Sequence, residues 1–379
     1  MSKKNKKSRW LIIVGARPNF VKVAPLIDEI KKHKGIKPIL IHTGQHYDFK
    51  MSQIFFQELK IPKPDYNLGV GSGSHAWQTA KIMEKLEPVI LKEKPDLVIV
   101  VGDVNSTLAG ALTAVKLHIP VAHIEAGLRS FDMTMPEEIN RLLTDHISDF
   151  LFCPTKTAVE NLKKEGIIKG VYNVGDIMYD TFKSSKLKAQ SSKVLKKLNL
   201  RPRTYLLLTL HRPANVDNPE NLKKILEAVQ ESGENVIFPA HPRTKKQLNK
   251  LNLLNQLNKL NKLNKLNQFI LVAPQGYLDM LCLEKNAKKI LTDSGGVQKE
   301  AYWLKVPCIT LRKETEWIET VKSGWNILVG CDKNKILWAI RNFKPKNKQH
   351  KYFGDGNCVK RIVKIIRGKF KHPRFNELL

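Results

Sequence analysis

Short runs of apolar residues alternate with longer segments of helical spacing along almost the whole chain. The runs are rich in Val, Ile and Leu and are strand-sized, and the segments between them are long enough for helices. This alternation is typical of a parallel sheet covered by helices, so we predict an α/β fold. Strands are expected in the first half at Trp10 to Val14, Lys37 to Thr43, Asp96 to Gly102, Val121 to Glu125 and Phe150 to Cys153, and in the second half at Tyr205 to Leu210, Asn235 to Pro239, Phe269 to Val272, Lys289 to Thr292 and Pro307 to Leu311.

Two groups of strands in a chain of 379 residues predict two domains, each with its own parallel sheet. A polar stretch rich in Lys and Ser, from Thr181 to Arg203, separates the two groups. We expect the connection between the domains near the start of this stretch. The first domain is therefore placed at residues 1–180 and the second at residues 181–357.

The segment from Leu248 to Leu266 has low complexity, with Leu at every third position and mostly Asn and Lys between. A period of three turns successive Leu side chains by about 60° around a helix, so no fixed apolar stripe forms. We expect an expanded surface repeat inserted in the second domain, with a short partner-binding helix as the alternative.

The net charge of +30 is the unusual feature of the composition. Lys is spread over the chain without the interleaved aromatic residues of a nucleic-acid stacking surface, so no specific nucleic-acid partner is expected. A positive field would instead attract an anionic substrate.

Cysteines and apolar runs exclude further classes of protein. The five cysteines occur singly, which argues against disulfides and zinc. No apolar run approaches the roughly 20 residues of a membrane span, and the run at Trp10 to Val14 is too short for a secretory signal. We expect a soluble cytoplasmic protein with no membrane partner.

Polar residues follow nearly every expected strand at its carboxyl end, where open parallel sheets bind ligands. They are Arg17, Asp103, Glu125, His211 with Arg212, His241, and the run Asp293-Ser294-Gly295-Gly296. Each has a structural alternative: Asp103 could cap the helix near Ser106, Glu125 could pair with Arg129, and His211 could be a core histidine. Their recurrence at so many strand ends favours one shared site.

Two expected helix starts carry candidate binding groups. Ser294, Gly295 and Gly296 open a helix whose backbone N–H groups would favour phosphate oxygens, and Glu300 farther along could hold ribose hydroxyls; a plain N-cap and turn is the alternative. Pro136-Glu137-Glu138-Ile139-Asn140-Arg141 has Pro first and acids in the first turn, which fits capping and function equally. The chain has neither a GxGxxG motif after its first strand nor a Walker A loop, so no nicotinamide cofactor is expected.

Seven motifs surround these residues. They are GARPNFVKVAPLI from Gly15, TGQHYD from Thr43, GDVNSTLAGAL from Gly102, HIEAGLRSFD from His123, MPEEINRLLTDHISD from Met135, TLHRPANVDN from Thr209 and DSGGVQKEA from Asp293. With them the chain closely resembles the non-hydrolysing UDP-N-acetylglucosamine 2-epimerases across about Trp10 to Ile366. The resemblance implies a fold similar to glycosyltransferase-B enzymes, two Rossmann-like domains with a cleft between them, and a last helix that returns to the first domain, so residues 358–379 are assigned there.

The resemblance also implies a chemistry: anti elimination of UDP to a 2-acetamidoglucal and re-addition of UDP, without a cofactor or metal. By motif position, Asp103, Glu125 and Glu137 resemble the family's catalytic acids, and His211 resembles a histidine at the pyrophosphate and sugar. The positions that would bind substrate or UDP are Arg17, Lys22, Arg141, Gln275, Ser294, Gly295, Gly296 and Glu300, to which His241 is added from its strand end. A homodimer and a role in making surface polysaccharide precursors are also expected.

The chain departs from the family pattern at several positions. Thr315-Glu316-Trp317 stands where many members have Thr-Glu-Arg, and Lys299 replaces an acid. Members that act on a UDP-2,3-diacetamido uronate are similar here, and Lys299 would suit the extra negative charge. UDP-N-acetylglucosamine is the expected substrate, with that uronate or a UDP-sugar glycosyltransferase activity as alternatives. Asp48 replaces a glutamine near the TGQH motif, which leaves open whether a second, allosteric UDP-sugar site operates.

Overall fold

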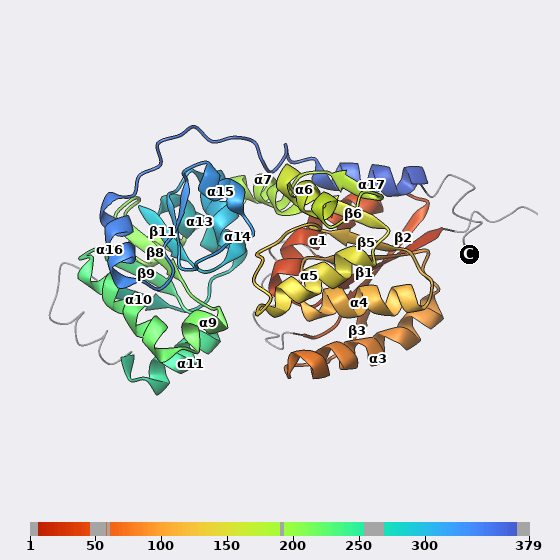
Figure 1. The fold of residues 1–379 in the computed structure, drawn as a ribbon, viewed down its shortest axis with the longest axis horizontal. Coiled ribbons are helices and arrows are strands. Elements are labelled where there is room, and N and C mark those ends of the chain that lie inside the picture. The colour runs from red at the N-terminus through yellow and green to blue at the C-terminus, as the bar shows by residue number, and fades with distance from the viewer. Residues whose placement is uncertain (1–6, 46–57, 59–60, 190–192, 254–268, 370–379) are drawn as a thin grey trace, which may run out of the picture. The chain divides into compact units, whose positions relative to one another are not determined.

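The computed structural model describes residues 7–45, 58, 61–189, 193–253 and 269–369, and the chain divides into two compact units (Figure 1). The first unit contains residues 1–184 and 351–379, and the second contains residues 185–350. The chain leaves the first unit within a helix, α7 (Ile177–Ala189), where sequence reasoning expected a polar connection. The helix forms there because Ile177 packs in the first core and Phe182 is buried.

The first unit is a seven-stranded parallel sheet with the strand order β3-β2-β1-β4-β5-β6-β7. Its elements are β1 (Ser8–Val14), α1 (Arg17–Lys31), β2 (Ile36–His42), β3 (Tyr66–Asn67), α3 (His75–Glu93), β4 (Leu97–Val101), α4 (Asn105–Lys116), β5 (Val121–Ile124), α5 (Pro136–His146), β6 (Phe150–Cys153), α6 (Lys156–Lys164), β7 (Val171–Asn173), the start of α7, and α17 (Cys358–Lys369).

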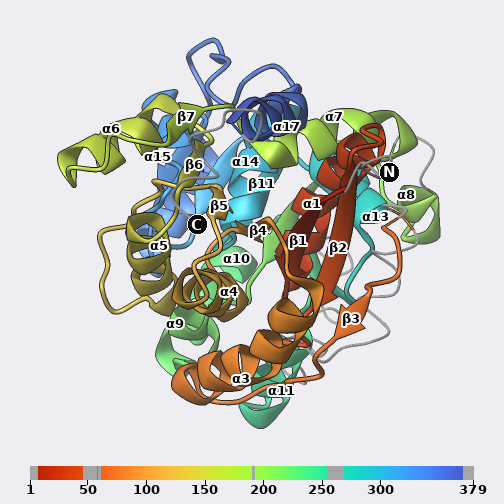
Figure 2. The same cartoon turned by 90° about the vertical axis from the view of Figure 1, so that its right-hand side faces the viewer.

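Both faces of this sheet are buried. On β1, Trp10, Ile12 and Val14 belong to one core cluster and Leu11 and Ile13 to another, as the two-residue period of a strand requires. Helices α1 and α17 contribute to the first cluster, and α3 and α4 cover the opposite face (Figures 1 and 2). The last helix therefore completes the core of the unit in which the chain begins.

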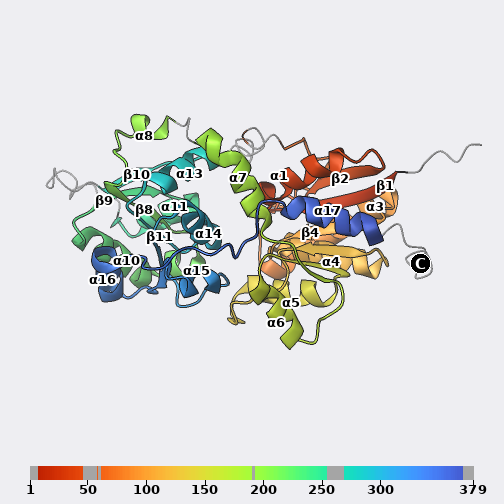
Figure 3. The ribbon, with the colours of Figure 1, turned by 90° about the horizontal axis from the view of Figure 1, so that it is seen from above.

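The second unit is a six-stranded parallel sheet with the order β10-β9-β8-β11-β12-β13. Its elements are α8 (Val194–Lys197), β8 (Tyr205–Thr209), α9 (Pro213–Val216), α10 (Pro219–Glu231), β9 (Asn235–Pro239), α11 (Pro242–Lys250), β10 (Phe269–Val272), α13 (Tyr277–Asn286), β11 (Lys289–Thr292), α14 (Gly295–Leu304), β12 (Cys308–Thr310), α15 (Ile318–Lys322), β13 (Asn326–Leu328) and α16 (Lys333–Asn342). Helices α10 and α16 cover one face, and α8 and α13 the other (Figure 3).

The predicted α/β class is confirmed, and every strand predicted from the sequence exists with ends within two residues of the predicted ones. Sequence reasoning missed three short strands, β3, β7 and β13. All three lie at sheet edges, where two or three residues leave no apolar run to detect. No helix within the described ranges has the length and apolar character needed to cross a membrane.

The start of the Leu-rich segment is not a surface repeat. Leu248, on α11, has no exposed surface, and Leu253 also packs in the core of the second unit. The expectation of a surface segment is wrong for Leu248 and Leu253, because both side chains pack in the hydrophobic core of the second unit. The rest of the repeat, residues 254–266, lies outside the described residues.

Candidate functional site

In the first unit, Glu125 forms a buried ion pair with Lys22 of α1. Glu125 directly follows β5, and Gly102 follows the neighbouring strand β4. A Cβ atom at position 102 would lie 3.0 Å from Lys22 Nζ and 3.4 Å from Glu125 Oε2, and the φ angle there is +72°. Glycine is therefore required where the backbone passes this pair.

The loop that carries Glu125 is held by a buried network behind it. His123 Nδ1 lies 2.7 Å from an Asp145 oxygen, and its Nε2 lies 2.8 Å from the Gly102 carbonyl oxygen. Burial alone would raise the pKa of Asp145, but the hydrogen bonds and charges of His123 and Arg129 lower it. The network fixes the backbone next to the ion pair. It holds Glu125 at a φ angle of +76°, which is unfavourable for a residue other than glycine.

Arg129 belongs to this network and not to Glu125. Its Nη1 donates to Asp145 at 2.7 Å, and its Nε and Nη2 donate to the two carboxylate oxygens of Glu165 at 2.7 and 2.6 Å. The expected alternative, a pair between Glu125 and Arg129 at helical spacing, is wrong because these residues lie in a loop rather than on a helix. Glu125 therefore pairs with Lys22, at the carboxyl end of β5.

Asp103 is a second carboxylate at the carboxyl ends of the strands, two residues after β4, and it is bound by Arg141 of α5. Arg141 Nε donates to Asp103 Oδ2 at 3.1 Å, and Asn140 Nδ2 donates to the Asp103 carbonyl at 2.9 Å. Helix α4 has Val104 at its N-cap without a side-chain cap, so the capping alternative for Asp103 is wrong. The Asp103 side chain is 30% exposed, whereas that of Arg141 is 1% exposed.

Sequence reasoning missed Glu138, the second acid in the first turn of α5. Its carboxylate accepts from the N–H groups of Ser130 and Phe131 at 2.9 to 3.1 Å and from Arg141 Nη1 at 2.6 Å. Glu138 thus anchors the loop before α5 and directs Arg141 toward Asp103. Glu137 lies half-buried on the same turn. The signal for Glu138 was an acid three residues before Arg141 on the expected helix, but the loop N–H groups that it also binds could not be predicted from spacing.

In the second unit, His211 follows β8 and pairs with Asp293 at the end of β11. His211 Nδ1 lies 3.0 Å from Asp293 Oδ1, and the N–H groups of His211 and Arg212 donate to the same carboxylate at 3.1 to 3.2 Å. Burial alone would raise the pKa of Asp293, but the charge and hydrogen bond of His211, the Arg212 N–H and Asn215 lower it. An ionised Asp293 orients the His211 ring, which is 43% exposed, with Nδ1 toward the protein and Nε2 available to a ligand.

Helix α14 begins with Gly295 and Gly296, and Ser294 occupies its N-cap position without a side-chain cap. A Cβ atom at position 295 would collide with Glu316 Oε1 and Trp317 Nε1, so a larger residue there would have to displace these two side chains. Backbone N–H groups at such a helix start attract anions.

Arg312 provides a cation near this helix start, and sequence reasoning did not select it. Arg312 Nη1 lies 3.0 Å from Glu316 Oε2, and Arg212 Nη2 lies 4.0 Å from Glu316 Oε1. Arg312 comes two residues after β12, so the strand-end rule applied to that strand would have found it.

Lys299 lies inside the second unit rather than at a rim. Its Nζ is 3.8 Å from the ring centroid of Trp317 and 5.8 Å from that of Trp303, and the residue is 1% exposed. The aromatic faces stabilise the ammonium group in place. This placement removes the argument that Lys299 would suit a more negative substrate.

Three other predicted site residues have local roles or lie outside the description. His241 Nδ1 accepts the Arg243 N–H at 3.2 Å and caps α11, and Gln275 Nε2 donates to the Ala273 carbonyl at 2.6 Å. The side chain of Arg17, and residues 46 and 48 of the possible allosteric loop, lie outside the described part of the chain.

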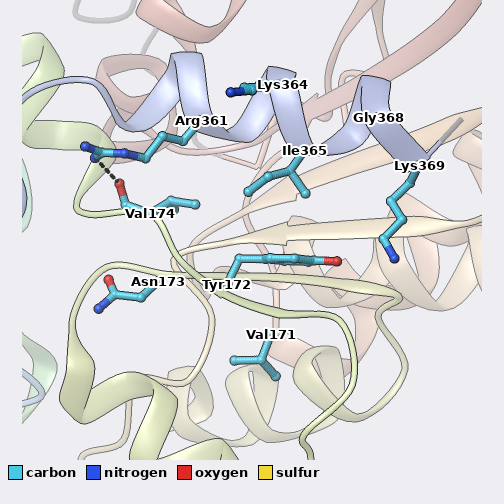
Figure 4. Close-up of a pocket in the computed structure, with 9 residues that line it drawn as sticks. All are labelled: Val171, Tyr172, Asn173, Val174, Arg361, Lys364, Ile365, Gly368 and Lys369. Atoms are coloured by element: carbon cyan, nitrogen blue, oxygen red, sulfur yellow. Dashed lines mark hydrogen bonds between the residues drawn. The ribbon is translucent and has the colours of Figure 1, made fainter. Parts of the chain in front are cut away.

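A pocket of about 730 Å³ lies elsewhere in the first unit, between β7 and α17 (Figure 4). Arg361 reaches across its end to the Val174 carbonyl at 3.1 Å, and Tyr172 forms part of the wall. None of the predicted site residues lines this pocket. Among the described residues, no group of three His, Cys, Asp or Glu side chains is placed to hold a metal ion.

Comparison with known proteins relates this arrangement to one family. A family model described as UDP-N-acetylglucosamine 2-epimerase matches residues 28–367. A UDP-N-acetylglucosamine 2-epimerase homolog of Methanococcus maripaludis is 56% identical, over 94% of this chain and 98% of the relative. A UDP-2,3-diacetamido-2,3-dideoxy-D-glucuronate 2-epimerase of Pseudomonas aeruginosa is 44% identical, over 94% of this chain and 98% of the relative. The crystal structure of a Methanocaldococcus jannaschii UDP-GlcNAc 2-epimerase in complex with UDP-GlcNAc and UDP has a TM-score of 0.88 and 49% identity, and the match covers 95% of this chain and 99% of that one.

Proposed function

This chain belongs to the UDP-N-acetylglucosamine 2-epimerase family, an isomerase family, and we propose that it interconverts UDP-N-acetylglucosamine and UDP-N-acetylmannosamine. The family match across residues 28–367 carries the proposal. The charged groups at the strand ends of both units support it, because they supply acids and bases in one unit and a phosphate-binding helix start in the other.

The proposed reaction needs no cofactor, because UDP leaves and returns and the proton lost from C2 is replaced by another, so the sugar undergoes no net oxidation or reduction. A base removes the proton from C2 while the bond between C1 and the UDP oxygen breaks. The electron pair of that C1–O bond leaves with the phosphate oxygen of UDP. The 2-acetamidoglucal then takes UDP back at C1 and a proton on the other face of C2. Because C2 is not next to a carbonyl, proton loss is coupled to UDP departure and positive charge develops at C1, which carboxylates stabilise.

The surroundings of the carboxylates suggest different roles in the first unit. Asp103 is partly exposed and held by Arg141, which suits a group that contacts the sugar and transfers a proton. Glu125 is closed in a pair with Lys22, which suits a fixed charge near C1. Glu137 would supply a third carboxylate from the start of α5.

The second unit would hold the leaving UDP. The start of α14, with Ser294, Gly295 and Gly296, supplies N–H donors for the pyrophosphate. His211 Nε2 would donate to the leaving oxygen, since Asp293 fixes the ring from the other side. Glu300 on α14 would accept hydrogen bonds from the ribose hydroxyls.

A UDP-2,3-diacetamido uronate remains the second candidate substrate, and the 44% identity to an epimerase of that name favours keeping it. Lys299 no longer supports it, since its ammonium group packs against Trp317. We therefore keep UDP-N-acetylglucosamine as the first candidate substrate. A ratio of kcat/KM values above about tenfold for the uronate, which is about 1.4 kcal/mol of transition-state binding, would reverse this order.

Incubation with UDP-N-acetylglucosamine in heavy water tests the proposal. We expect deuterium at C2 of both epimers and no free monosaccharide, with Asp103→Asn as a variant that should exchange at least about 100-fold more slowly. Release of free N-acetylmannosamine would indicate a hydrolysing enzyme. UDP release that requires an acceptor, without exchange at C2, would indicate a glycosyltransferase.

We also propose that the enzyme is a cytoplasmic homodimer that makes precursors of surface polysaccharides. A groove of about 340 Å³ on the first unit, lined by residues of α3 and α5 that include Met83 and Ile139, supports a protein interface. Trp77 and Leu143 on the same helices are also exposed. Light scattering should give twice the monomer mass for the intact protein and the monomer mass for Ile139→Asp.

A further inference from the structure

The Asn215 side chain connects the carboxyl ends of three neighbouring strands next to the pair of His211 and Asp293. Asn215 lies on α9, in the segment after β8, and is 4% exposed. Its Nδ2 donates to Asp293 Oδ2 at 3.1 Å, directly after β11, and to the Leu311 carbonyl at 3.0 Å, directly after β12. Its Oδ1 accepts a hydrogen bond from the Cys331 thiol, after β13, at 3.0 Å. The amide therefore has a partner at both of its ends.

These partners determine which end of the Asn215 amide faces Asp293. An ionised carboxylate and a backbone carbonyl only accept hydrogen bonds, so the amide nitrogen must face Asp293 and Leu311. Burial and the charge of Asp293 raise the pKa of the Cys331 thiol, which keeps its proton and donates it to the amide oxygen. A reversed amide would place its oxygen against two acceptors. The orientation of Asn215 thus follows from the chemistry of its three partners.

Asp293 is held in front of the His211 ring by donors that carry no net charge. Asp293 has no exposed surface. Its Oδ2 accepts from the Asn215 amide and from the backbone N–H groups of His211 and Arg212, and its Oδ1 lies 3.0 Å from His211 Nδ1. Neutral donors fix the direction of the carboxylate and leave its negative charge to the ring. Without the Asn215 amide, Oδ2 would lose a buried donor and the carboxylate could rotate away from His211.

We propose that Asn215 is a positioning residue, which holds Asp293 so that the His211 ring presents Nε2 to the leaving oxygen of UDP. This inference rests on the proposed function, because it concerns how His211 assists the departure of UDP. The hydrogen bond from Nδ1 to Asp293 leaves Nε2 as the atom from which the ring donates. Charge develops on the leaving oxygen only as the bond to C1 breaks, so loss of this alignment should lower kcat rather than weaken substrate binding.

A double-mutant cycle on the full-length protein tests the proposal, with exchange at C2 of UDP-N-acetylglucosamine in heavy water as the measured rate. Asn215→Leu removes the donor at similar volume and should lower kcat about tenfold with KM within about twofold of wild type. Asp293→Asn should lower kcat about 100-fold, and the double variant should be no slower, because a residue that acts through Asp293 then has nothing to position.

Asn221 supplies a matched control on the neighbouring helix α10. Its Nδ2 donates to the Ala214 carbonyl at 3.0 Å, so Asn221→Leu also removes an amide that binds the backbone of α9. This variant should keep kcat within about twofold of wild type. A double variant of Asn215 and Asp293 about tenfold slower than Asp293→Asn would overturn the proposal, as would Asn215→Leu at the wild-type rate. A wild type without exchange at C2 would overturn the proposed function instead.

Nitrogen NMR of the His211 ring gives a second measurement that does not depend on turnover, with its signals assigned by their loss in His211→Asn. In the neutral ring of the wild type the proton should lie on Nδ1, and Asn215→Leu should increase the share of the tautomer with the proton on Nε2. An unchanged share in Asn215→Leu, or a wild-type ring with its proton on Nε2, would contradict the proposal. If Asn215→Leu does not fold, Asn215→Ala takes its place in both measurements with the same expected results.

Discussion

Replacing Glu125 by Gln should reduce both activity and stability, because its partner Lys22 is buried with it. Only 7% of the Lys22 side chain and 6% of the Glu125 side chain are exposed. Removing one partner of a buried ion pair leaves an uncompensated charge, which typically costs about 3–5 kcal/mol. For a unit of this size 1 kcal/mol corresponds to about 2–4 °C, so we expect the melting temperature to fall by roughly 6–20 °C.

Two further variants separate stability from catalysis. Asp103→Asn changes a side chain that is 30% exposed, so it should melt close to the wild-type temperature while slowing exchange at C2 by about 100-fold or more. The double variant Lys22→Met with Glu125→Gln removes both buried charges and should recover most of the lost melting temperature without recovering activity.

Thermal unfolding and deuterium exchange at C2, measured on the same preparations, check these expectations. If Glu125→Gln melts at the wild-type temperature, the pair contributes no net stability and the reasoning from burial is wrong. The same conclusion would follow if the double variant were no more stable than the single one.

Four other changes test separate parts of the structure. Gly102→Ala places a side chain at a φ angle of +72° beside the ion pair and should cost about 1–3 kcal/mol in urea unfolding; a neutral change would contradict the steric argument. Asp293→Asn should slow exchange at C2 by about 100-fold because it no longer orients His211, and full activity would remove this role. The pKa of Asp145 is lowered from 3.8, so the stability it contributes is present above that pH and is lost as the pH falls further; the acid side of a melting-temperature profile should be flatter in Asp145→Asn. Leu248→Ala should cost about 2–5 kcal/mol in urea unfolding, because its side chain is fully buried, whereas a surface repeat would tolerate it.

The α/β fold and the main strands could be predicted from the sequence because their signals are local. Each buried strand is an apolar run, and each helix has its own period, so neither needs a distant partner to be recognised. The rim residues Asp103, Glu125 and His211 could be selected for a related reason: strands of a parallel sheet all end at the same edge. Edge strands such as β7 carry too few residues for either signal.

The sequence by itself determined which residue types stand at the strand ends, and the tertiary structure decided which of them bind each other. Glu125 pairs with Lys22, 103 positions away, and not with Arg129 four positions away. Glu138, which sequence reasoning did not select, binds Arg141. Sequence spacing predicts contacts only within one helix or strand, whereas ion pairs between elements depend on how the helices pack on the sheet. Packing also buries some of these charges, and burial gives each pair its effect on stability and chemistry.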